Sequence, residues 1–166
     1  MSTFGNHTRT LKRPEWRLAV EVFALSLPKY DQILITDGLG AGNRPWTEAI
    51  TGFIHPLVRG SHRGGEWRLH LGKDGFANAM QMKNTLVHEL AHVWQGYNSF
   101  FGDSYMFKSL YAQIKGDAYK YKLGKSWGDY NPEQQAQIVE DWYAAGMKRN
   151  DPRHVYMEKH IWAGRN

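Results

Sequence analysis

The pentapeptide His88-Glu89-Leu90-Ala91-His92 constrains this chain more than any other feature of its sequence. Residues 78–94 carry apolar side chains at helical spacing, so we expect one long helix over this range. Residues four apart on a helix lie one turn apart on the same face, and both imidazoles can therefore reach one ion. The sequence thus predicts a metal-binding pair of histidines on a helix.

Glu89 stands beside the first histidine, where its carboxylate can contact a water molecule on a bound ion. Zinc lowers the pKa of such a water toward neutrality, and a neighbouring carboxylate then accepts its proton. The pattern predicts His88 and His92 as ligands of one Zn²⁺ and Glu89 as the catalytic base. The alternative interpretation is a buried structural pair of histidines with a surface glutamate.

The third ligand is less clearly marked. The chain contains no cysteine, so any metal has nitrogen and oxygen ligands. A catalytic zinc site needs three protein ligands and an open fourth position. His154 and His160 lie far downstream and remain candidates. A helix that we expect to begin at Asn131-Pro132 carries the other candidates, which are Glu133, Glu140 and Asp141.

The segment Glu133-Gln134-Gln135-Ala136 resembles the ExxA(D) element of the gluzincin metallopeptidases. In that element the Glu is the third ligand and the small Ala lets two helices approach, so the resemblance implies Glu133 as the ligand. Glu140, seven residues on and nearly on the same helix face, is its competitor. The usual Asp is replaced by Gln137, which leaves the contact to a zinc-bound histidine to Gln137 or Asp141.

Three blocks extend this likeness: ILITDGLGAGNRPWT, TLVHELAHVWQ and YNPEQQAQIVEDWY, within residues 33–143. Together they resemble the zincin metallopeptidase domains associated with bacterial type VI secretion. Some of these are C-terminal extensions of spike proteins, and others are free-standing effectors. The resemblance implies a zincin fold, one zinc ion and a toxin role against rival bacteria or host cells. It also implies a secretion spike and an immunity protein as partners.

The expected fold class is a single α+β domain over residues 1–166, with a small sheet packed on the helix of the pentapeptide. Residues 1–13 are expected to be a loose lead-in, and residues 43–65 to be irregular. Strands are predicted over 32–36 and 66–71. Further helices are predicted from Pro14 to Leu27, from about 103 to 114, from 131 to 146 and over 151–162.

Other residues are candidates for the substrate cleft. Arg44, Trp46 and Thr47 either line it or pack a loop. The strand 66–71 is interpreted as an edge strand that holds an extended peptide. A hydrolytic transition state needs a hydrogen-bond donor for its oxyanion. The chemically suitable candidates are Tyr119, Tyr121, His154 and His160.

The formal net charge of +5 is spread along the chain without a basic run, so no nucleic-acid partner is expected. We see no apolar stretch of membrane-spanning length and no apolar core of a secretory signal. Secretion would therefore use a route without a classical signal peptide. The predicted function is a zinc-dependent metallopeptidase with a peptide or protein substrate. The alternatives are a metallo-amidase acting on peptidoglycan and a non-catalytic zinc-binding module.

Overall fold

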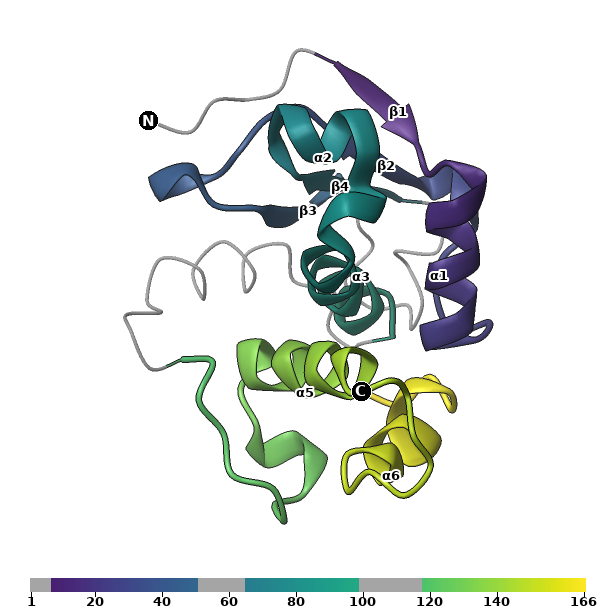
Figure 1. The fold of residues 1–166 in the computed structure, drawn as a ribbon, viewed down its shortest axis with the longest axis vertical. Helices are drawn as coiled ribbons and strands as arrows, with labels where there is room; N and C mark the ends of the chain where they lie inside the picture. The colour runs from purple at the N-terminus through teal and green to yellow at the C-terminus, as the bar shows by residue number, and fades with distance from the viewer. Residues whose placement is uncertain (1–6, 51–64, 99–117) are drawn as a thin grey trace.

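A small mixed sheet forms one layer of the structure, as Figure 1 shows. Its strands are β1 (Thr8–Thr10), β2 (Ile33–Thr36), β3 (Trp46–Ile50) and β4 (Glu66–His70), in the order β1-β2-β4-β3. β2 and β4 are parallel, whereas β1 and β3 pair with them antiparallel. The computed structural model describes residues 7–50, 65–98 and 118–166.

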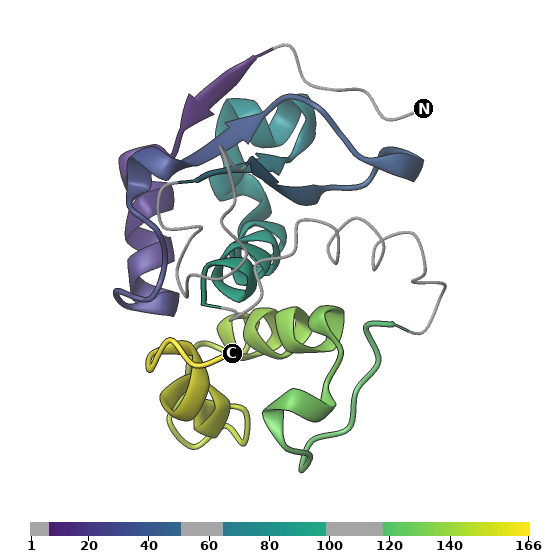
Figure 2. The ribbon, with the colours of Figure 1, turned by 180° about the vertical axis from the view of Figure 1, so that it is seen from behind.

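The helices complete an α+β fold, which confirms the predicted fold class. They are α1 (Arg13–Phe23), α2 (Gly72–Asn78), α3 (Lys83–Asn98), α5 (Pro132–Ala144) and α6 (His154–Tyr156), the last continuing as a π-helical turn over Met157–Ile161. α3 lies between the sheet and α5, as the views from the front and from behind both show (Figures 1 and 2). No helix in the described ranges is both long and apolar enough to cross a membrane.

One part of the core lies between the sheet and α3. Alternate strand residues point to one face of a sheet, and Ile35 of β2 and Leu69 of β4 are fully buried on the face that shares a core with α3. Leu86 and Leu90 of α3 belong to the same core and are fully buried. This packing holds α3 in a fixed orientation and so determines where its polar face points.

The prediction that residues 66–71 form an edge strand is wrong. The strand that begins at Glu66 is β4, which pairs on one side with β2 and on the other with β3. Among the described strands β3 lies at one edge of the sheet, although residues 43–65 were expected to be irregular. Pro45 and the glycines before it conceal this strand in the sequence, and its pairing with β4 along its whole length stabilises it.

The helix boundaries also differ from the predicted ones. The predicted start at Asn78 is a separate 3₁₀ turn, in which the Asn78 side chain accepts a hydrogen bond from the Met80 amide, and α3 begins only at Lys83. α1 ends at Phe23, before the predicted Leu27, because Ala24 adopts a positive φ of 53°. α5 begins where predicted, with Asn131 as its cap. The helix predicted over 103–114 lies outside the described residues.

The expectation of a loose lead-in is wrong for residues 8–13, because β1 and the start of α1 occupy them. The guanidinium of Arg9 forms a two-pronged ion pair with Glu15, at 2.7 and 2.8 Å. Glu15 is fully buried and also accepts hydrogen bonds from the amides of Lys12 and Ala79. A buried carboxylate needs such partners, and they attach the N-terminal segment to the body of the fold.

Candidate metal centre and cleft

His88 and His92 lie one turn apart on the face of α3 that packs against α5. Their ring centroids are 5.0 Å apart, with the ring planes nearly perpendicular at 77°. Leu86 and Leu90 are offset by two residues, so they point to the opposite side of the helix and enter the core. The alternation of core and polar residues along α3 thus turns both imidazoles toward α5.

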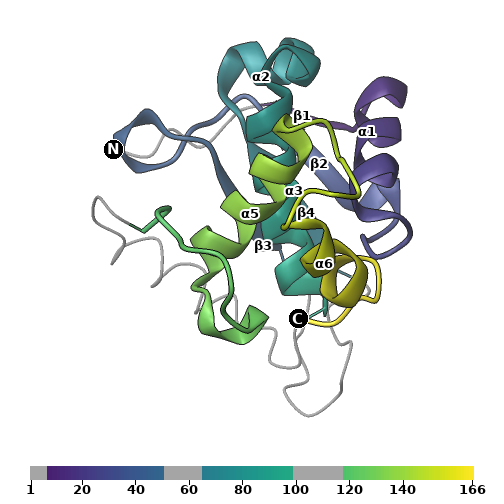
Figure 3. The same cartoon turned by 60° about the horizontal axis from the view of Figure 1, so that its bottom comes forward.

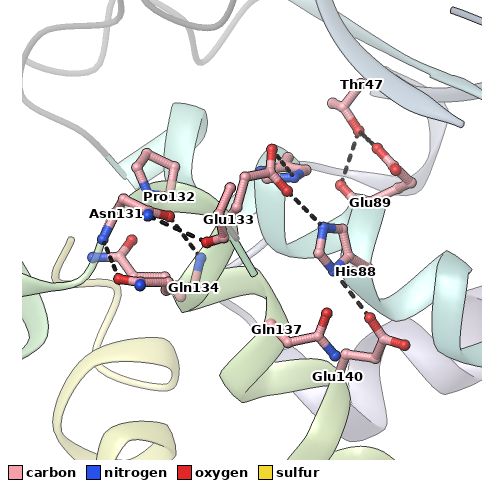
Figure 4. Close-up of polar contacts among 12 residues, drawn as sticks. Thr47, His88, Glu89, Asn131, Pro132, Glu133, Gln134, Gln137 and Glu140 are labelled. Atoms are coloured by element: carbon pink, nitrogen blue, oxygen red, sulfur yellow. Dashed lines mark hydrogen bonds and ion pairs between the residues drawn. The ribbon is translucent and has the colours of Figure 1, made fainter. Parts of the chain in front are cut away.

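Glu133, in the first turn of α5, contacts His88, as Figure 4 shows, and also lies beside His92. The helix start is fixed locally, because the Asn131 side chain accepts a hydrogen bond from the Gln134 amide at 2.9 Å. The Glu133 carboxylate lies 3.1 Å from Nε2 of His88 and 3.4 Å from Nε2 of His92. Three potential ligand atoms, one from each residue, therefore lie within 4.8 Å of one another, and all three residues are buried.

Glu140 occupies a different place. Its carboxylate lies 3.0 Å from Nδ1 of His88, on the nitrogen that faces away from Glu133. The geometry therefore favours Glu133 over Glu140 as a companion of the two Nε2 atoms. Gln137 and Asp141, the contacts suggested by the resemblance, hydrogen bond to each other at 2.8 Å.

A chain of amide groups orients His92. Gln95 Oε1 lies 2.8 Å from Nδ1 of His92, while Gln95 Nε2 donates to Pro132 O and to Gln135 Oε1. The Gln135 amide in turn donates to Trp127 O. These donations identify which end of each amide is the oxygen. Nδ1 of His92 therefore donates to Gln95, and Nε2 is the nitrogen that faces Glu133.

The charges of the cluster influence one another strongly. Burial lowers the pKa of His88, but hydrogen bonds to Glu133 and Glu140 outweigh burial and raise it to about 10. Burial raises the pKa of Glu133, but the charge of His92 and hydrogen bonds from both imidazoles hold it well below its usual range. The centre therefore favours a positive charge between the carboxylate and the rings.

This donor set fits a metal ion. Two imidazole Nε2 atoms and one carboxylate are the ligands of one class of catalytic zinc site. Each Nδ1 has its own acceptor, Glu140 for His88 and Gln95 for His92, which is the usual arrangement around a metal-bound histidine. Among the residues that the structure describes, His88, His92 and Glu133 are the group that could hold a metal ion.

Glu89 lies next to this centre and is almost completely buried. The hydroxyl of Thr47 in β3 is 2.7 Å from the Glu89 carboxylate and 3.1 Å from the Glu89 carbonyl oxygen. Burial raises the pKa of Glu89, while the two imidazoles and the Thr47 hydroxyl oppose this rise. β3 thus positions a carboxylate whose proton affinity is higher than usual.

A cleft of about 500 Å³ opens beside His88 and Glu89. The remaining lining residues come from the loop before β3, from α3, from the segment before α5 and from α5 itself: Arg44, Pro45, Thr85, Tyr119, Gln137 and Glu140. Of the residues expected at a cleft, Arg44 lines it directly, and Thr47 contributes through Glu89. Trp46 instead stacks on the ring of His70, 4.4 Å away.

The four candidates for the oxyanion donor lie in different parts of the structure. Tyr119 lines the cleft, with its ring centroid 5.8 Å from that of His88. Tyr121 donates a hydrogen bond to Asp141 at 2.6 Å, outside the cleft lining. His154 pairs with Glu158, and His160 stacks on Trp127 near the C-terminal turn, in the region that Figure 3 brings forward. The structure brings only Tyr119 of these four to the cleft lining.

Sequence reasoning missed Gln95 and Gln135 as supports of His92. Their spacing is the available signal, because Gln95 lies three residues after His92 and Gln135 two residues after Glu133. It also missed the contact between Thr47 and Glu89, which depends on the position of β3.

Part of this chain is similar in sequence to a component of the type VI secretion machinery. The chain is 36% identical over 76 residues to the type VI secretion system spike protein VgrG2b of Pseudomonas aeruginosa. The match covers 42% of this chain but only 7% of the spike protein. No family model and no solved structure matches the chain. The similarity agrees with the type VI secretion context that the sequence blocks suggest.

Proposed function

We propose that this protein is a zinc-dependent hydrolase that cleaves peptide bonds. The observation that carries the proposal is the convergence of His88, His92 and Glu133 in one buried group, with His88 and Glu89 lining an open cleft. When bound there, zinc would supply a Lewis acid for the scissile carbonyl and would activate water. The remaining chemistry belongs to the side chains of this chain.

Glu89 would act as the proton acceptor and later as the donor to the leaving amine. Burial raises its pKa and so suits the carboxylate to hold a proton between these two steps. The hydrogen bond from Thr47 fixes the orientation of the carboxylate. A purely structural metal site gains nothing from a buried carboxylate held in this way, which argues against the non-catalytic module.

Tyr119 is the residue that we propose as the oxyanion donor. It lines the same cleft as Glu89, and its ring centroid lies 5.8 Å from that of His88. A phenolic hydroxyl can donate a hydrogen bond, so Tyr119 can offer its proton to a substrate oxygen. A positioned donor of this kind is worth roughly 10²- to 10³-fold in kcat.

A peptide is the substrate class that the cleft suits. β3 is an edge strand among the described residues, and its Thr47 touches Glu89 directly. An edge strand offers unpaired backbone groups to an extended chain. A peptide that pairs with β3 would pass the metal centre with its backbone held in register.

We further propose that the protein works as a secreted effector toxin linked to a type VI spike, against rival bacteria or host cells. The support is the similarity to the spike protein over 76 residues. Such delivery would need no classical signal peptide. A dedicated immunity protein would then protect the producing cell.

The test compares native protein with Glu89→Gln, each loaded with one equivalent of zinc. Both are incubated with a complex mixture of peptides, and new termini are identified by mass spectrometry. We expect cleavage by the native protein and a loss of about 10²- to 10⁴-fold in the variant, with zinc retained. Glu21→Gln, the same exchange on an exposed residue of α1, serves as the matched control.

The same pair of proteins tests the toxin role when each is directed to the cytoplasm or to the periplasm of bacterial cells. Growth arrest by the native protein, but not by Glu89→Gln at equal abundance, is expected in one compartment. Equal toxicity of both proteins would show that harm comes from binding and would overturn the enzymatic proposal.

A further inference from the structure

Among the described residues that line the cleft, Arg44 is the one arginine or lysine. The other charged groups there, apart from the imidazole of His88, are the carboxylates of Glu89 and Glu140, which are engaged by Thr47 and His88. Within the described residues, no carboxylate lies within ion-pair distance of Arg44. Its guanidinium therefore presents a forked set of donors to the cleft, a geometry that matches a carboxylate.

The loop that carries Arg44 is fixed at several points. The Arg44 carbonyl accepts a hydrogen bond from the Gly40 amide at 2.8 Å. A side chain at Gly40 would collide with Trp46, because an added Cβ would lie 2.8 Å from the indole ring. Trp46 is itself stacked on His70, which is buried in the sheet. The backbone at Arg44 is thus held by the hydrogen bond from Gly40 and by the packing of the nearby Trp46.

The direction of β3 indicates which part of a bound peptide would lie near Arg44. β3 runs from Trp46 to Ile50, with Thr47 beside Glu89, and Arg44 lies two residues before its start. A peptide that pairs antiparallel with β3 passes Ile50 first and Trp46 last. Residues on the carboxyl-terminal side of the bond attacked near Glu89 would therefore approach Arg44.

We propose that Arg44 is a specificity residue that binds a carboxylate on the carboxyl-terminal side of the scissile bond. The preferred substrates are then acidic peptides, with either an acidic side chain or a free terminal carboxylate at that position. This inference rests on the proposed peptidase function and adds the substrate class to it. Arg44 is exposed, so the selectivity it confers is moderate and decreases as salt is added.

The experiment uses two synthetic peptides made from one cleaved sequence, with Glu or Gln at the second position after the cut. Native protein is expected to cleave the Glu peptide with a kcat/KM about five- to tenfold higher, mostly through KM. Arg44→Gln should remove this preference, so that the ratio of kcat/KM for the Glu and Gln peptides falls to about one. Arg17→Gln, the same exchange on an exposed residue of α1, should retain the preference.

A binding measurement separates the inference from the proposed function. Zinc-loaded Glu89→Gln protein, with and without Arg44→Gln, is titrated against fluorescein-labelled hexapeptide pools that carry Glu or Gln at one position. Tighter binding of the Glu pool that depends on Arg44 supports the site even if no peptide is cleaved, an outcome that would overturn only the hydrolase. The carboxylate site would be overturned if native protein cleaved and bound the Glu and Gln peptides equally well. It would also be overturned if Arg44→Gln lowered kcat/KM by the same factor for both peptides.

Discussion

The carboxylate of Glu140 lies 3.0 Å from Nδ1 of His88, on the side of the imidazole ring opposite to Glu133. The two carboxylates of α5 therefore contact the two nitrogens of one histidine. If Nε2 binds a metal ion, Nδ1 carries a proton, and an acceptor such as Glu140 fixes the ring and raises its basicity. Glu133 and Glu140 are seven residues apart and lie nearly on the same face of α5. This spacing lets one carboxylate face Nε2 of His88 and the other face Nδ1.

Removal of Glu140 is expected to weaken zinc binding without abolishing it. Glu140→Ala should lower zinc affinity by about 10- to 100-fold, the usual loss when the partner of a metal-bound histidine is removed. Glu140→Gln retains an acceptor oxygen and should lose less. Competition with a coloured chelator measures both affinities, and Glu158→Ala, on an exposed glutamate that pairs with His154, is the control. A complete loss of zinc in Glu140→Ala, with full retention in Glu133→Ala, would reverse the assignment.

Gln95 is expected to contribute to stability as well as to metal binding. In Gln95→Ala, the carbonyl of Pro132, the side chain of Gln135 and Nδ1 of His92 lose a partner. Leaving buried polar groups unpaired should lower the free energy of unfolding by about 1–3 kcal/mol. Urea denaturation of zinc-free protein measures this, with the exposed Gln81→Ala as control. A variant as stable as native protein would show that these amide hydrogen bonds do not stabilise the fold.

Thr47→Val should reduce catalysis while zinc binding stays unchanged. The substitution keeps the shape of the side chain but removes the hydroxyl that lies 2.7 Å from the Glu89 carboxylate. A hydrogen bond to a charged group contributes about 1.5–3 kcal/mol, so we expect kcat to fall about tenfold or more. Steady-state kinetics on a cleaved peptide gives kcat, and elemental analysis gives the zinc content. Unchanged kcat would mean that Glu89 keeps its orientation without Thr47.

The free energy of unfolding should depend on pH through His70. This histidine hydrogen bonds to Thr36 and Glu48, not to residues of the proposed metal centre. Burial lowers the pKa of His70, and the neighbouring Glu48 only partly opposes this. A depressed histidine pKa means that the folded state favours the neutral ring. The stability it provides is present above the unfolded value of about 6.5 and is lost as pH falls through the lower folded value.

His70→Gln preserves hydrogen-bonding groups between Thr36 and Glu48 but cannot titrate. The free energy of unfolding of native protein should therefore fall more steeply between pH 7 and pH 5 than that of the variant. Urea denaturation in the presence of a chelator gives both curves. Parallel curves would show that His70 does not control this pH dependence.

The sequence alone predicted the parts of the site that depend on local spacing. His88 and His92 share a helix face because of their separation, and Asn131-Pro132 sets the start of α5, which fixes Glu133. Both features follow from nearest-neighbour chemistry along the chain. The α+β class followed in the same way from alternating and helical apolar patterns.

Features that depend on contacts between distant segments were not predictable in this way. The sequence of β3 resembles that of a loop because Pro45 precedes it. Only its pairing with β4 makes it a strand. The expectation of a loose N-terminal segment failed because Arg9 meets the buried Glu15, a contact that appears only when the chain has folded. The links from Gln95 to α5 and from Thr47 to Glu89 are of the same kind.

Zinc content, measured by elemental analysis, tests most directly whether His88, His92 and Glu133 form one metal centre. Protein stripped with chelator is supplied with one equivalent of zinc and passed through a desalting column. Native protein and Glu89→Gln are expected to retain about one zinc per chain, whereas His88→Ala and Glu133→Ala should retain almost none. Native protein that retains no zinc, or the same retention in all four proteins, would contradict the proposed centre.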